Sequence, residues 1–288
     1  MKLGVALRLG RVSNLPTVWT NVFAALAISG SLSGLPALQL VPSLSLYYLG
    51  GMYLNDAFDR QIDAVERPGR PIPSGQVSSG LVFALGFAWL LFGFLLLLQA
   101  ARSSGASLPY AALSGLALAL CIVGYDLYHK QNPLSPVLMG MCRVLVYVCS
   151  ALAVQPELRP DLLWGAAALL CHLIGLSYAA KQEAYNRLTR VWPLAFLAAP
   201  ALYGICLAIR QPVVWPFLVV FVGWVLYALR FLRPGSQRSV PQAIVRLIAA
   251  IALLDALLIA STGAFGWALA AVALAALTRL FQRYIPGT

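Results

Sequence analysis

Long apolar runs alternate with short polar connections along the whole chain, and this pattern predicts membrane-spanning helices. About ten runs approach the ~20 residues that a helix needs to cross a bilayer. They are continuously apolar and rich in Leu and Ala, whereas strands of a membrane barrel would be shorter and would alternate apolar with polar positions. The expected segments are roughly 14–33, 38–56, 80–101, 108–126, 136–154, 161–180, 192–209, 213–232, 242–262 and 264–283.

The composition strengthens this prediction. Hydrophobic residues make up 61% of the chain and charged residues only 10%, whereas soluble domains carry about 25% charged residues. So few charges do not cover the surface of a water-exposed globule. We therefore expect an all-α integral membrane protein, a bundle of nine to ten transmembrane helices that residues 1–288 form as a single domain.

The positive charges are distributed unevenly between the two ends of the predicted spans. With the amino terminus in the cytoplasm, sixteen Lys and Arg residues fall at cytoplasmic ends, three at outer ends, and Arg143 inside a span. Because cytoplasmic connections are enriched in Lys and Arg, this orientation in the cell (inner) membrane is expected. It explains the net charge of +11 without nucleic acid as a partner, and the two longest polar connections, 57–79 and 181–191, then share the cytoplasmic face.

An acidic cluster at the end of the second predicted span is the most unusual feature of the sequence. Four of the nine acidic residues lie within eleven positions, from Asp56 to Glu66. If the helix continues past the span, Asn55, Asp59 and Asp63 share one face, because they are spaced by four. Closely spaced carboxylates repel one another where solvation is poor, and a divalent cation relieves that repulsion. Oxygen ligands suit Mg²⁺, which binds through one or two carboxylates together with substrate phosphates. The alternative is a solvated loop in which the acids pair with Arg60, Arg67 and Arg70.

The stretch Asn55-Asp56-Ala57-Phe58-Asp59-Arg60-Gln61-Ile62-Asp63, followed by Glu66-Arg67-Pro68-Gly69-Arg70-Pro71-Ile72-Pro73-Ser74-Gly75, resembles the first aspartate motif of the UbiA superfamily of membrane prenyltransferases. The resemblance covers essentially the whole chain in span order, and it also extends to the EboC-like branch of that superfamily. It implies a UbiA-type bundle in which Asp56, Asp59 and Asp63 bind Mg²⁺, and in which Asn55 and Arg67 help to bind a prenyl diphosphate.

The position of the second family motif, after the sixth predicted span, departs from the family pattern. Tyr178 and Lys181 match a YxxK pattern of relatives and are expected to be catalytic. The acidic pair is missing: Glu183 is the only carboxylate, and Arg187 stands four residues later. Glu183 with Asn186 would supply oxygen ligands for a metal, or Lys181 and Arg187 would contact the diphosphate directly, as basic side chains often do.

Three further polar residues are candidates for substrate binding. Arg143 lies inside the fifth predicted span, where a charge is costly and by default a functional hypothesis; it would bind phosphate or pair with Asp59 or Glu183, and the alternative is a side chain that reaches the membrane surface. Lys130 would assist the phosphate, whereas its neighbour His129 is expected to be an interfacial residue. Asn14 would cap the first span or line the substrate pocket.

The residues predict a Mg²⁺–phosphate site at a membrane mouth, and the resemblance implies a prenyltransferase that transfers an alkyl group other than methyl. A prenyl diphosphate binds with Mg²⁺ at the cytoplasmic mouth, and the prenyl group passes to an aromatic or lipophilic acceptor in the lipid bilayer. The resemblance leaves other outcomes open: phosphoribosyl transfer to polyprenyl phosphate, terpene cyclisation, or a lipid-binding or transport component without catalysis.

Overall fold

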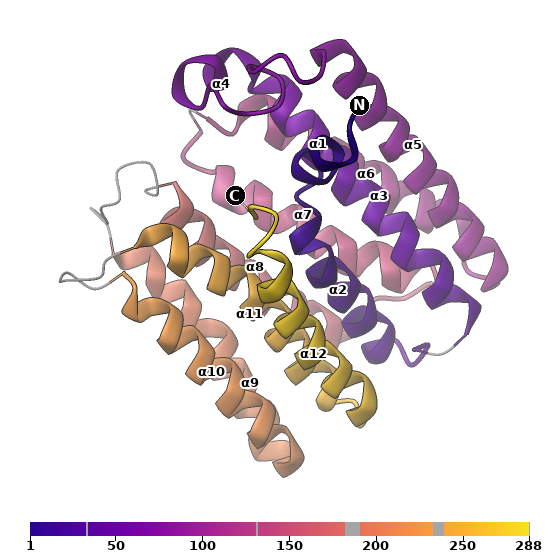
Figure 1. Ribbon diagram of the computed structural model, residues 1–288. Coiled ribbons are helices and arrows are strands. Elements are labelled where there is room, and N and C mark those ends of the chain that lie inside the picture. Colours follow the sequence, from indigo (N-terminus) through magenta and orange to yellow (C-terminus); the bar gives the residue numbers. More distant parts are fainter. Residues whose placement is uncertain (33, 131, 182–190, 233–238, 288) are drawn as a thin grey trace.

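The computed structural model describes residues 1–32, 34–130, 132–181, 191–232 and 239–287, and within them it contains helices and no strand (Figure 1). The elements are the helices α1 (Leu3–Leu9), α2 (Leu15–Ile28), α3 (Leu35–Phe58), α4 (Arg60–Glu66), α5 (Ser79–Ser103), α6 (Leu108–Tyr128), α7 (Ser135–Leu152), α8 (Pro160–Ala180), α9 (Ala198–Arg210), α10 (Trp215–Arg230), α11 (Val240–Ala260) and α12 (Phe265–Phe281), with 3-10 turns at Val12–Asn14, Trp192–Leu197 and Pro212–Val214.

The long helices match the ten predicted segments to within a few residues. Seven stretches of helix in the described residues are long and apolar enough to cross a membrane: α5 to α8, α11, and α9 and α10 together with the turns that precede them. α2 and α12 are shorter apolar helices. α3 has the length of a span but is less apolar, because it carries the polar residues that lead into the acidic motif. The prediction of an all-α membrane bundle is confirmed.

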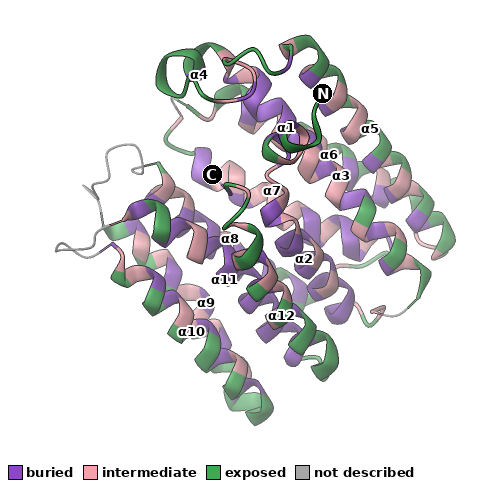
Figure 2. Ribbon diagram, viewed as in Figure 1, coloured by how far each residue is buried: buried purple, intermediate pink, exposed green. Residues whose placement is uncertain are grey.

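The two larger apolar cores of the bundle share α2 and α7, and a third, smaller one lies between α1, the end of α3 and the start of α5. One larger core joins α2 and α7 to α8 and to α9–α12, and the other joins them to α3, α5 and α6. α11 is the central helix of the first core: every residue from Leu247 to Ala260 is buried. Figure 2 shows this contrast, with α11 mostly buried and the outer faces of α5 and α10 exposed. The exposed faces carry large apolar side chains such as Phe92, Leu120 and Val219, as expected of a surface in contact with lipid.

Small residues let α3 and α5 pack with their backbones close together, a recurrent device in membrane bundles. A Cβ atom added at Gly50 would lie 2.9 Å from the carbonyl oxygen of Gly86, and one added at Gly93 would lie 2.9 Å from that of Ser43. The Ser43 hydroxyl donates to the Gly93 carbonyl at 2.7 Å. This contact fixes the position of α3, whose end carries the acidic motif.

The substitution Gly50→Val is expected to destabilise the bundle, because the new side chain meets backbone that cannot move without separating α3 from α5. Overpacking of this kind costs about 1–3 kcal/mol. The matched control is Gly223→Val in α10, where an added Cβ meets nothing within 4 Å. Thermal unfolding in detergent measures both, and equal melting temperatures for the two variants would contradict the packing argument.

Candidate functional site

The acidic motif lies where α3 ends and α4 begins, near the end of the bundle that also holds both chain termini (Figure 1). Helical hydrogen bonds continue through the junction: the N–H of Asp59 donates to the Asn55 carbonyl at 3.0 Å, and that of Asp63 donates to the Asp59 carbonyl at 2.8 Å. The spacing of four therefore does place these residues on one side, as predicted. Asn55, Asp56, Asp59 and Asp63 are all at least 94% buried.

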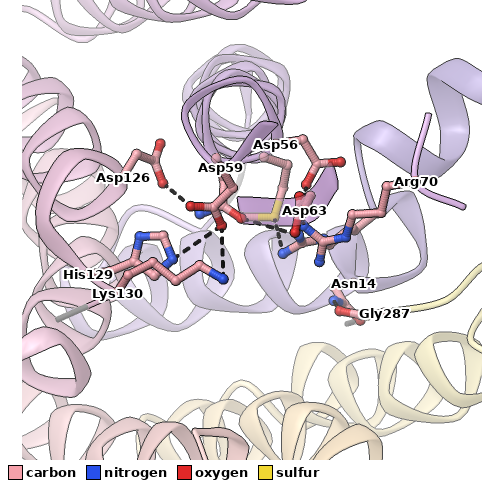
Figure 3. Close-up of polar contacts among 12 residues, drawn as sticks. Asn14, Asp56, Asp59, Asp63, Arg70, Asp126, His129, Lys130 and Gly287 are labelled. Atoms are coloured by element: carbon pink, nitrogen blue, oxygen red, sulfur yellow. Dashed lines mark hydrogen bonds and ion pairs between the residues drawn. The ribbon is translucent and has the colours of Figure 1, made fainter. Parts of the chain in front are cut away.

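Two of the buried carboxylates share one arginine (Figure 3). The Arg70 guanidinium donates to Asp63 at 2.6 Å and to Asp56 at 3.3 Å. A second arginine, Arg11, contacts Asp56 at 3.0 Å and Asn55 at 3.2 Å. Arg11 adopts a φ of 40°, a left-handed conformation that is uncommon outside glycine.

The third carboxylate, Asp59, faces the end of α6 (Figure 3). His129 Nε2 lies 3.3 Å and Lys130 Nζ 3.6 Å from its Oδ2 atom. Burial opposes ionisation of Asp59, but the hydrogen bond from His129 and the charges of His129, Lys130 and Arg70 outweigh it and lower its pKa. Asp59 is therefore an anion at neutral pH, available to a cation.

A cavity of about 320 Å³ opens beside these groups. Its lining combines one carboxylate with several guanidinium groups, so that it is strongly positive. The residues that line it are Arg8, Arg11, Asp56, Arg67, Gly69, Arg70, Pro71 and Pro286. Arginine recognises phosphate through paired N–H groups, and a cavity of this charge and size suits a diphosphate.

The carboxylates of the acidic motif fit a hard divalent ion that binds together with a phosphate ligand. In the described residues, no three His, Cys, Asp or Glu side chains converge on one point where a metal would be held. The carboxylate oxygens nonetheless match the preference of Mg²⁺, which takes one or two carboxylates and completes its shell with substrate oxygens and water. One further oxygen is available: Oδ2 of Asp126 is buried and has no partner, while its Oδ1 accepts from Asn55 at 3.1 Å.

Two of the predicted site residues, Tyr178 and Lys181, form hydrogen bonds to one connection of the bundle. Tyr178 donates to the Pro133 carbonyl at 3.0 Å and Lys181 donates to the Asn132 carbonyl at 2.6 Å, both on the connection between α6 and α7. Glu183, Asn186 and Arg187 lie outside the described residues, so their predicted roles stay predictions.

Asn14 and Arg143 also have partners that differ from those expected. The Asn14 side chain makes no helix-capping hydrogen bond; it donates to the Gly287 carbonyl at 2.8 Å and accepts from Gln282 at 3.0 Å. Arg143 donates to Thr17 and Asn21 on α2, so the pairing with Asp59 suggested as one alternative is wrong. The hydrogen bonds from Arg143 to polar side chains of α2 lower the free-energy cost of burying its charge inside the bundle.

Four residues of the site were not singled out as site residues from the sequence. Arg8 and Arg11 belong to the positive charges assigned to the cytoplasmic side, and Arg70 is a partner of the acids only in the alternative of a solvated loop; the structure pairs it with Asp56 and Asp63. His129, expected to be an interfacial residue, also contacts Asp59. Their proximity to the acids depends on how α1, α6 and the loop after α4 fold back onto the end of α3. The one indication in the sequence that basic side chains would lie near the acids was the excess of basic over acidic residues.

The chain matches the UbiA prenyltransferase family over residues 13–246. It belongs to that family. A digeranylgeranylglyceryl phosphate synthase of Methanopyrus kandleri is 28% identical over 255 residues, which cover 85% of this chain and 87% of that protein. The synthase of the same name from Halobacterium salinarum strain R1 is 29% identical over 227 residues, covering 75% and 79%. A shorter match, to the synthase of Ignicoccus hospitalis, is 37% identical over 115 residues, covering 40% of this chain and 37% of that one.

Solved structures of UbiA homologues share the fold. The homologue from Archaeoglobus fulgidus bound to GPP and Mg²⁺ superposes with a TM-score of 0.61 at 14% identity, over 93% of this chain and 99% of that one. The same homologue bound to DMAPP and Mg²⁺ gives 0.60 at 15% identity, with the same coverage. This UbiA-family chain is thus a multi-pass membrane enzyme that transfers prenyl groups. The finer resemblance to the EboC-like branch stays a prediction.

Replacing Arg70 with Gln is expected to destabilise the UbiA-family bundle in the absence of ligand. The substitution removes the partner of Asp63, which is 1% exposed, and an unpaired buried polar group costs about 1–3 kcal/mol, more if it is charged. Arg67→Gln is the matched control, since Arg67 is exposed. Thermal unfolding without added Mg²⁺ compares them, and a melting temperature for Arg70→Gln at or above that of the control would rule out the ion-pair role.

Proposed function

We propose that this protein transfers the prenyl group of an allylic prenyl diphosphate to a lipophilic acceptor within the membrane, with Mg²⁺ and the diphosphate bound at the end of α3. The observation that carries the proposal is the cavity in which Arg8, Arg11, Arg67 and Arg70 face Asp56. Four guanidinium groups against one carboxylate leave a net positive site, whose preferred ligand is a compact polyanion.

The carboxylates would hold the metal at the edge of this cavity. Asp56, Asp59 and Asp63 are the residues proposed to bind Mg²⁺. When bound, the ion neutralises phosphate charge and stabilises the diphosphate as it leaves. Arg70 and Lys130, now paired with these acids, would then turn to the phosphate oxygens, which replace the carboxylates as their partners.

The reaction breaks the bond between the allylic C1 carbon and the diphosphate oxygen, and the bonding electron pair leaves with the diphosphate. The arginines around the cavity stabilise that developing charge because they are already oriented toward it. The acceptor nucleophile forms the new bond to C1 and loses its proton. Enclosure within the bundle excludes water, so that the allylic cation reacts with the acceptor instead of being hydrolysed.

The acceptor is proposed to be a glycerol lipid phosphate. The support is that the relatives aligned over most of the chain are named digeranylgeranylglyceryl phosphate synthases. The site is proposed to face the cytoplasm, because the basic residues concentrate at this end of the spans as the positive-inside rule requires.

Asp59→Asn is expected to lower Mg²⁺-dependent diphosphate release by about 100-fold or more, since the amide keeps the shape of the carboxylate but loses the charge that attracts the cation. Release of diphosphate from geranylgeranyl diphosphate by the purified protein measures this. The control is Glu66→Gln: Glu66 belongs to the same acidic run, but its side chain is 60% exposed. Equal turnover of the two variants would refute the metal site.

Geranylgeranyl diphosphate is expected to raise the melting temperature only when Mg²⁺ is present, because the metal bridges the donor to the carboxylates. Differential scanning fluorimetry with and without EDTA tests this dependence. A shift of the same size in EDTA would show that the arginines alone bind the diphosphate.

A further inference from the structure

A second polar cluster lies in the interior of the bundle, separate from the acidic motif. Its centre is Asp255 of α11, which is 0% exposed. The hydroxyl of Tyr147 donates to Oδ1 of this carboxylate. The hydroxyl of Thr20 and the amide of Asn21 donate to Oδ2, at 2.5 and 2.8 Å. Three donors from α2 and α7 therefore fix the Asp255 side chain.

Asn21 connects this carboxylate to a buried cation. Its amide nitrogen donates to Asp255, and its amide oxygen accepts from Arg143 Nη1 at 2.9 Å. Arg143 Nη2 donates to the Thr17 hydroxyl at 3.0 Å. The orientation of the Asn21 amide is determined by both charged groups, so that a change at Asp255 is transmitted to Arg143.

The cluster balances its charges. A single charge in the hydrocarbon region of a bilayer is costly, and such residues pair with one another or mark substrate pathways. Arg143 and Asp255 belong to one network of hydrogen bonds, and when Asp255 is ionised their charges sum to zero. An anion bound here would leave a net negative charge in poorly polarisable surroundings, whereas an uncharged oxygen would not.

Arg143 retains donors for such an oxygen. A guanidinium has five N–H groups, and the bonds to Thr17 and Asn21 use two of them. The guanidinium carbon lies 5.6 Å from the centre of the Tyr48 ring, and Tyr48 donates to the Arg11 carbonyl at 3.1 Å. Arg11 in turn contacts Asp56, so Arg143 is only two residues removed from the metal-binding carboxylates.

Arg143 also lies deeper in the membrane than the acidic motif. It is eight residues beyond Ser135, the first residue of α7, which corresponds to about 12 Å along the helix axis. It is half-buried, not fully enclosed. A ligand whose diphosphate occupies the cavity at the end of α3 would thus place its reacting carbon between that cavity and Arg143.

We propose that Asp255 is a positioning residue that holds Arg143, through Asn21, so that the remaining N–H groups of Arg143 bind an uncharged oxygen of the acceptor, such as the hydroxyl that becomes prenylated. This inference rests on the proposed function and adds to it the part of the site that recognises the acceptor. It assigns a role to Asp255, Asn21 and Thr20, which the donor site does not use.

The test measures steady-state transfer by the purified full-length protein, with geranylgeranyl diphosphate as the donor and Mg²⁺ present. Geranylgeranylglyceryl phosphate, a glycerol lipid phosphate with a free hydroxyl, is the acceptor. Asp255→Asn, Arg143→Met and the double variant are compared with Ser150→Ala, a control on α7 whose buried hydroxyl bonds only within its own helix, to the Val146 carbonyl.

Each single substitution is expected to raise the acceptor KM by about 10- to 100-fold, the loss that corresponds to a hydrogen bond to a charged group. The donor KM should change by less than about threefold, because the interaction lost is confined to the acceptor. The double variant should be no worse than Arg143→Met alone, because Asp255 acts through Arg143; such non-additivity identifies residues that work as one unit.

A merely structural role gives a different pattern: the effects of the two substitutions add, and both KM values change together. That result, or an unchanged acceptor KM in Asp255→Asn, overturns the inference. If Asp255→Asn does not yield folded protein, Tyr147→Phe and Asn21→Leu replace it under the same criteria. A wild-type protein that shows no Mg²⁺-dependent diphosphate release, or does not use this acceptor, contradicts the proposed function itself.

Discussion

The organisation of this protein depends on the cost of burying carboxylates at the boundary of a membrane. Asp56, Asp59 and Asp63 are almost inaccessible, and a buried charge without a partner is strongly destabilising. Each of the three is therefore matched by basic side chains from other elements: Arg11 from the amino-terminal segment, Arg70 from the loop after α4, and His129 and Lys130 from the end of α6. The acidic motif thereby ties the end of α3 to three other parts of the chain.

The same ion pairs make the site suitable for exchange of partners. Negative and positive groups are already close together in a partly desolvated position, so a metal diphosphate would exchange one set of charge contacts for another. Mg²⁺ would take the place of the basic side chains beside the carboxylates, and the phosphates would take the place of the carboxylates beside the basic side chains. In this arrangement, the residues that stabilise the empty protein and those that bind the donor are the same.

In the interior of the bundle, one basic and one acidic side chain balance each other. Arg143 and Asp255 neutralise each other through Asn21, at a depth where water is scarce and where an unpaired charge would be costly. The donor cavity, by contrast, carries an excess of positive charge. The two regions therefore favour different ligands: a polyanion at the membrane boundary, and an uncharged oxygen in the interior.

The sequence by itself determined the helices and the acidic motif on which the proposed donor site rests. Apolar runs long enough to cross a bilayer predicted ten helices within a few residues of their bounds, because hydrocarbon forces each span to satisfy its own backbone. The spacing of Asn55, Asp59 and Asp63 predicted that they share one face of a helix, because helical periodicity depends only on positions close together in the chain. Only the tertiary structure decided the partners. That Arg11 reaches Asp56 across 45 positions, that His129 faces Asp59, and that Arg143 bonds to α2 all follow from how the helices pack, and helix packing depends on contacts between side chains far apart in the chain.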